Sequence, residues 1–169
     1  MVKIFHIITF FLCFSLLSCQ SISNVKDKLL RKVDKFKVNR IDGITFDKLY
    51  ILEGIYETSR DYEIKSPKLE IHRGSDLKKY EDYLIVHNDS KVDMLYAENI
   101  SLAHQLLNKS SSSSLYGVIY KNKHNLILEI IEAFKMGGGY GTNKNYVKVI
   151  DKKIYIQEIG RCSVYVLAE

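Results

Sequence analysis

Spaced metal ligands are missing from this sequence. The cysteines form no Cys-x-x-Cys pair, and no His-x-His or His-Glu-x-x-His pattern occurs among the histidines that follow residue 19, which are His72, His87, His104 and His124. Zinc sites depend on such spacings, because two ligands must reach the ion from one short segment. We therefore expect neither a metal nor another cofactor.

A nucleotide-binding loop is also absent, although one segment is rich in glycine. This segment consists of Gly137, Gly138, Gly139, Tyr140 and Gly141. A phosphate-binding loop needs a lysine directly after its last glycine and then a helix, so that backbone N–H groups and the lysine converge on the anion. Here Thr142 and Asn143 precede Lys144, and a strand pattern follows. The segment is predicted to be a connecting loop or, alternatively, a loop that contacts a partner.

The apolar run at the start of the chain is too short to cross a membrane as a helix. Residues 4–18 would span about 22 Å at 1.5 Å per residue, against roughly 30 Å of hydrocarbon. Lys3 precedes this run and the small residue Ser18 ends it. A basic start, a short apolar run and a small residue are typical of a signal peptide, which we place at residues 1–18.

The end of this leader carries a specific motif. Leu16-Leu17-Ser18-Cys19 has an aliphatic residue, a small residue and then a cysteine. It resembles the lipobox of bacterial lipoproteins. The resemblance covers only about 20 residues and implies that Cys19 is joined to diacylglycerol and becomes the first residue of the mature chain. It also implies a membrane-held envelope protein, on the outer membrane if the cell is Gram-negative, since Gln20 is not the Asp that retains such proteins at the inner membrane.

Three cysteines leave little room for thiol chemistry. Cys13 is removed with the leader, and lipidation would block Cys19, so Cys162 would be the only thiol and no internal disulfide could form. If Cys19 were instead free, as in an ordinary secreted protein, a Cys19–Cys162 bridge could form. A nucleophilic Cys162 would define the competing hypothesis of a small envelope hydrolase.

The positive charge is confined to one segment. The formal net charge is +5, and residues 26–40 alone contribute seven bases against two acids, whereas residues 41–169 hold 17 bases and 18 acids. A nucleic-acid-binding domain would carry its basic surface on the folded body, so nucleic acid is not an expected partner.

The basic segment has helical periodicity. Val25, Leu29, Leu30, Val33 and Phe36 share one helical face, and Asn24 is a candidate N-cap. We expect residues 19–24 to form a tether between the lipid and this helix. The opposite face is predicted either to be solvated or to contact anionic headgroups, at about 1 kcal/mol per base, through Lys26, Lys28, Arg31, Lys32 and Lys35.

Strand patterns dominate the rest of the chain. Strands are predicted at 49–58 with a bulge at Gly54, and at 68–72, 83–87, 115–120 and 162–167; hairpins are predicted around Asp42-Gly43 and over 146–159. Ser90 and Asp93 resemble a capping box, which favours a helix over 91–108. Residues 126–135 fit either a helix, with Glu129 and Glu132 on a solvated face, or the second arm of a hairpin. Together these elements predict one α+β domain over 25–169, mainly an antiparallel sheet with two or three helices.

The functional hypothesis follows from the anchor, the nearly neutral body and the lack of a catalytic motif. We expect a non-enzymatic, membrane-anchored protein that binds a protein partner or an envelope component, for example as an inhibitor or an immunity protein. The hydrolase that uses Cys162 is the alternative.

Overall fold

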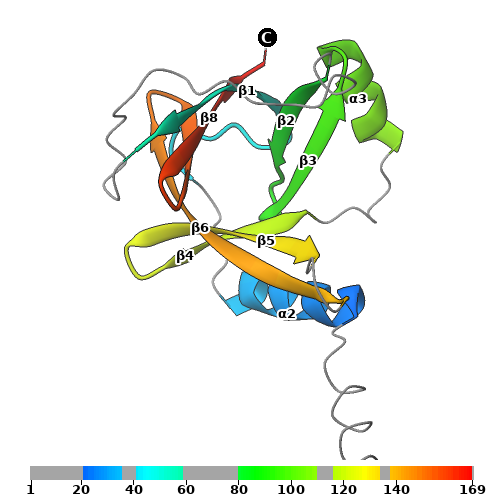
Figure 1. The fold of residues 1–169 in the computed structure, drawn as a ribbon, viewed down its shortest axis with the longest axis vertical. Helices are drawn as coiled ribbons and strands as arrows, with labels where there is room; N and C mark the ends of the chain where they lie inside the picture. Colours follow the sequence, from blue (N-terminus) through cyan, green and yellow to red (C-terminus); the bar gives the residue numbers. More distant parts are fainter. Residues whose placement is uncertain (1–20, 36–40, 59–79, 110–115, 134–137, 169) are drawn as a thin grey trace, which may run out of the picture.

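Eight antiparallel strands form a closed barrel in which each strand pairs with its neighbour in sequence and β1 pairs with β8 (Figure 1). The computed structural model describes residues 21–35, 41–58, 80–109, 116–133 and 138–168. The strands are β1 (Leu49–Glu57), β2 (Glu81–Val86), β3 (Lys91–Ala97), β4 (Gly117–Asn122), β5 (Asn125–Ala133), β6 (Tyr140–Ile150), β7 (Lys153–Glu158) and β8 (Arg161–Leu167). This closure leaves no free sheet edge among the described strands.

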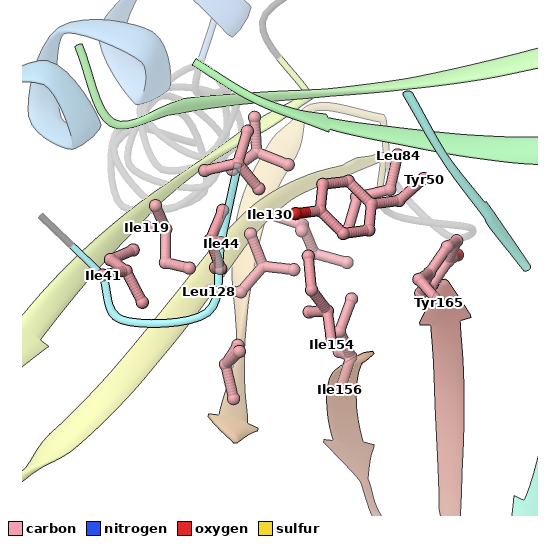
Figure 2. Close-up of a cluster of buried hydrophobic side chains, with 13 residues drawn as sticks. Ile41, Ile44, Tyr50, Leu84, Ile119, Leu128, Ile130, Ile154, Ile156 and Tyr165 are labelled. Atoms are coloured by element: carbon pink, nitrogen blue, oxygen red, sulfur yellow. The ribbon is translucent and has the colours of Figure 1, made fainter. Parts of the chain in front are cut away.

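Side chains of alternate residues fill the barrel interior, as the period of a strand requires. Ile119 of β4, Leu128 and Ile130 of β5, and Ile154 and Ile156 of β7 meet there (Figure 2). The loop before β1 joins the same cluster through Ile41 and Ile44, which lie beside Ile119 and Leu128. The interior at this end is therefore a packed apolar core.

Two helices among the described residues cover the outer surface of the barrel. α2 (Ile22–Lys35) lies against β4, β5 and β6, and α3 (Ile100–Lys109) lies beside β3 (Figure 1). Leu29 and Val33 of α2 pack on Val118, Tyr120 and Ile127, and a second outer cluster beneath α3 contains Tyr83, Ile85 and Ala103. No helix within the described part of the chain has the length and apolar character to span a membrane.

The predicted α+β class is wrong, because the molecule is predominantly a β-barrel. The main error concerns residues 91–108, where β3 occupies 91–97 and the helix starts only at Ile100. Ser90 is no N-cap: it lies in the β2–β3 turn with a φ of 68°. Asn99 has that role instead, since its Oδ1 accepts a hydrogen bond from the Leu102 N–H at 2.9 Å. The apolar residues of this stretch fit both the two-residue spacing of a strand and the 3.6-residue spacing of a helix, so the hydrophobic pattern does not distinguish the two.

Most of the other predicted elements are confirmed. β5 resolves the ambiguity of 126–135 in favour of the hairpin arm, and the 146–159 hairpin, the last strand and the bulge between Leu52 and Gly54 are present. The basic helix is also present, but Ser21 caps it instead of Asn24, since the Ser21 Oγ accepts from the Asn24 N–H. The Asp42-Gly43 turn forms without a strand after it, and the strand predicted at 68–72 lies outside the described residues.

Candidate functional site

Helix α2 carries the predicted basic residues on a support fixed to the barrel. Its apolar side is buried at Val25, Leu29 and Val33. On the other side Lys28, Arg31 and Lys35 are exposed, Lys26 is half-buried, and Lys32 turns toward the barrel. Three of the five predicted bases, Lys28, Arg31 and Lys35, are therefore exposed, whereas Lys26 is half-buried and Lys32 is directed against the barrel.

Lys32 binds a buried carboxylate that belongs to β5. Its Nζ lies 2.6 Å and 2.7 Å from the two carboxylate oxygens of Glu129. The hydroxyls of Tyr120 and Thr142 also donate to this carboxylate, each at 2.7 Å. We call Lys32, Tyr120, Glu129 and Thr142 the Glu129 cluster. The Glu129 side chain is only 1% exposed, so the expectation of a solvated face at this residue is wrong.

The chemistry of the cluster keeps Glu129 ionised. Burial raises the pKa of Glu129, but the hydrogen bonds from Lys32, Thr142 and Tyr120 outweigh burial and leave it below its ordinary value. Burial and the bond to Glu129 raise the pKa of Tyr120, so its hydroxyl stays protonated and can donate. A carboxylate with three donors is stable only where they are held in place, and α2 supplies one of them.

A hollow lies between α2 and the start of β6, with a volume of about 290 Å³. We call it the α2 hollow; it is lined by Val25, Lys28, Leu29, Arg31, Lys32, Glu129, Gly141 and Thr142. Within the described residues, Lys28 and Arg31 form no hydrogen bond or ion pair. Two cations at the edge of this hollow therefore have no carboxylate partner there.

The glycine-rich segment reaches the same place. Tyr140 and Gly141 are already part of β6, and Gly141 lines the α2 hollow. Gly138 and Gly139 precede the strand, and Gly137 lies outside the described residues. The fold thus brings together two sets that the sequence suggested separately, namely the basic helix and the candidate partner loop.

Of the two cysteines with predicted roles, Cys162 is described and Cys19 is not. Cys162 lies on β8 and is fully buried. Burial, followed by the charge of Glu158, raises the pKa of its thiol to about 11. A reactive cysteine must be accessible and must be deprotonated to the thiolate, and the Cys162 thiol meets neither condition. Cys19 falls outside the described residues.

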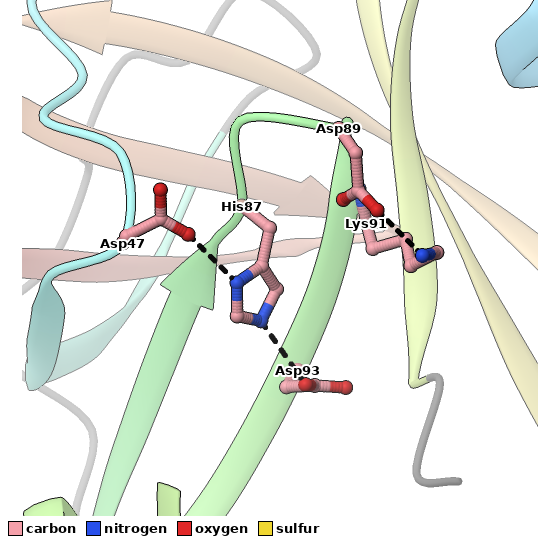
Figure 3. A network of polar contacts seen from close by, with 5 residues as sticks. All are labelled: Asp47, His87, Asp89, Lys91 and Asp93. Atoms are coloured by element: carbon pink, nitrogen blue, oxygen red, sulfur yellow. Dashed lines mark hydrogen bonds and ion pairs between the residues drawn. The ribbon is translucent and has the colours of Figure 1, made fainter. Parts of the chain in front are cut away.

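A second polar network, which sequence reasoning missed, joins the β2–β3 hairpin to the loop before β1. His87 contacts two carboxylates, with Nδ1 2.9 Å from Asp47 and Nε2 3.1 Å from Asp93 (Figure 3). Beside it, Lys91 pairs with Asp89. The hydrogen bond to Asp93 is the main cause that raises the pKa of His87; burial lowers it, and Asp47 raises it further. The sequence could have indicated the contact between His87 and Asp93 only through the alternation of side chains on two paired strands, which places these two side chains on the same face of the sheet.

The His87 network predicts a pH dependence. Because the folded-state pKa of His87 is raised, its stabilising effect is complete below the unfolded value of about 6.5 and is lost as pH rises through the folded pKa. Asp93→Asn should lower the pKa of His87, as followed by an NMR titration of its ring protons. Asp89→Asn, which leaves both partners of His87 in place, should change this pKa much less. The same pKa of His87 in the wild type and in Asp93→Asn would refute this prediction.

The described residues contain no group of three or more His, Cys, Asp or Glu side chains placed to hold a metal ion. The α2 hollow, whose cations Lys28 and Arg31 have no carboxylate partner in the described part of the chain, is the candidate binding site that the geometry offers. Comparison of the chain with protein-family models, with curated proteins and with solved structures gave no match.

Proposed function

We propose that this protein is a lipid-anchored, non-enzymatic binding protein of the bacterial cell envelope. In this proposal, acylated Cys19 holds it on a membrane, which is the outer membrane if the cell is Gram-negative. The barrel domain binds a protein partner or an envelope component. The observation that carries the proposal is the position of α2, which begins only three residues after Cys19 and presents a basic face.

Chain length limits how far α2 can lie from the anchor. Gln20 and Ser21 separate Cys19 from Ile22, and three extended residue steps cover at most about 11 Å. The start of the helix therefore lies close to the headgroups whenever Cys19 is in the bilayer. Each exposed base near an anionic surface contributes about 1 kcal/mol of attraction, so Lys28, Arg31 and Lys35 support the lipid anchor.

Binding is favoured over catalysis by the state of Cys162. A hydrolase nucleophile has to reach its substrate, whereas this thiol is 0% exposed and its pKa is raised. Closed barrels commonly serve as rigid supports for recognition, although a fold alone does not specify a function. The packed core and the fixed helix suit a domain that presents a surface.

The anchor is tested by replacing the cysteine in the native host. Cys19→Ser, expressed behind a leader whose removal does not require lipidation, should move most of the protein from the membrane fraction, washed at high salt, to the soluble fraction, because several kcal/mol of acyl-chain burial are lost. Cys13→Ser, which changes a residue of the leader only, should remain membrane-bound. Mass spectrometry of the mature N-terminus should find diacylglycerol on Cys19. A bare Cys19 in native protein would contradict the proposal.

A further inference from the structure

We propose that the α2 hollow binds the phosphate group of an anionic phospholipid from the membrane that holds the anchor. The proposal rests on the proposed function, since the lipid is available because Cys19 is acylated. It goes further by naming a discrete site with a defined ligand, in place of a diffuse attraction between a basic helix and a charged surface.

The charges around the hollow suit a phosphate monoanion. Lys28, Arg31 and Lys32 line it together with the single acid Glu129. Lys32 already neutralises Glu129 through contacts at 2.6 Å and 2.7 Å, so the charge of the other two bases is not compensated within the lining. Arginine can bind two phosphate oxygens at once, and lysine supplies a point charge beside it.

The Glu129 cluster has a definite part in this arrangement. Without Lys32, the carboxylate of Glu129 would repel an approaching phosphate at short range. With Lys32, Tyr120 and Thr142 bound to it, the negative charge is satisfied and only 1% of the Glu129 side chain is exposed. The cluster holds α2 on the barrel and removes the repulsive charge from the opening.

The walls of the hollow allow a headgroup to approach closely. Val25 and Leu29 are buried and give an apolar wall, while Gly141 has no side chain at the start of β6. A phosphodiester with its glycerol carbons presents both charged and apolar surface, as these walls do. The glycine-rich segment therefore contributes through Gly141 to lipid contact, not to a nucleotide site.

The position of the hollow along α2 favours lipid over other sources of phosphate. Lys28 lies six residues after the start of the helix, which is about 9 Å along its axis. It is therefore within reach of headgroups around an anchor at Cys19. The remaining body has a net charge of −1 over residues 41–169, with 17 bases and 18 acids, which opposes an extended polyanion as the ligand.

The test uses the anchored chain in neutral maltoside micelles. We would titrate it with dihexanoyl phosphatidylglycerol and follow the amide NMR signals of Gly141 and Thr142. The expected result is saturable binding that Lys28→Glu/Arg31→Glu weakens about tenfold or more, because two favourable charges are reversed. The control Lys48→Glu/Lys152→Glu makes the same change of net charge outside α2 and should weaken binding less than twofold. Lys28→Gln/Arg31→Gln removes the two charges without reversing them. This milder variant should also weaken binding, which distinguishes the effect of charge from a folding defect in the Glu variant.

If binding is saturable, three further results would still overturn the proposal. These are equal weakening by the control pair, equal binding of dihexanoyl phosphatidylcholine, and saturation of the same signals by inorganic phosphate at the same concentration. The last outcome would define a general anion site. Failure of the proposed function has a different signature, namely a bare Cys19 in native protein while the titration succeeds. A lipidated Cys19 with no saturable binding would reject the hollow alone.

Discussion

Lys32→Met is expected to lower the free energy of unfolding by about 2 kcal/mol at pH 7. The substitution leaves the carboxylate of Glu129 buried without its cationic partner. Removing one member of a fully buried ion pair costs about 3–5 kcal/mol. A smaller loss is expected here because the Lys32 side chain is 35% exposed and partly screened by water. Urea denaturation of the wild type and the variant at equal ionic strength measures the difference.

A second variant and a pH series separate the ion pair from lost packing. Lys32→Met/Glu129→Gln should recover at least half of the loss, since a neutral amide needs no cationic partner: its oxygen can accept from one of the two hydroxyls of Tyr120 and Thr142, and its NH2 group can donate to the other. The pKa of Glu129 is depressed in the folded wild type, so its stabilising effect is present above the unfolded value of about 4.3 and is lost as pH falls through the folded pKa. The penalty for Lys32→Met should therefore shrink in acid. A penalty that does not change with pH would show that Lys32 acts through packing alone.

Gly117→Ala is expected to destabilise the barrel by about 3 kcal/mol, at the upper end of overpacking costs. A Cβ at this position would lie 2.6 Å from the backbone oxygen of Glu129 and 3.1 Å from the Cα of Ile130. Both atoms belong to the backbone of β5, so the strands themselves must separate. Gly117 also pairs with Val92, in one of only two residue pairs that join β3 to β4 in the described residues. Displacement of β4 therefore threatens the closure of the barrel.

Gly160→Ala is the matched control for this prediction. Gly160 has a φ of +75°, and no atom lies within 4 Å of the Cβ that alanine would add. Its cost should be about 1–2 kcal/mol, from the left-handed backbone alone. Thermal unfolding ranks the two variants, and hydrogen exchange at residues 117–119 should accelerate only in Gly117→Ala. A smaller loss for Gly117→Ala than for Gly160→Ala would show that β4 and β5 accommodate the methyl group.

Part of the candidate site could be predicted from local pattern. The spacing of Val25, Leu29 and Val33 was sufficient to place a helix and its basic face, because a helix repeats every 3.6 residues whatever it packs on. Gly141 was singled out for its composition, but no pattern joined it to the helix. Glu129 was misjudged because its environment depends on whether residues 126–135 form a helix or a strand, and the apolar residues fit both.

By itself, the sequence determined the features that neighbouring residues settle: the amphipathic helix, the hairpin over 146–159 and the bulge near Gly54. Only the tertiary structure decided that the sheet closes, since the pairing of β1 with β8 joins residues more than 100 positions apart and no local pattern encodes it. Closure then determines which face of each strand points into the barrel and which points outward. It places Glu129 outside the core, beneath α2, where Lys32 can reach it. The physical reason is that burial of a strand residue depends on what packs against its face, and that partner comes from a distant part of the chain.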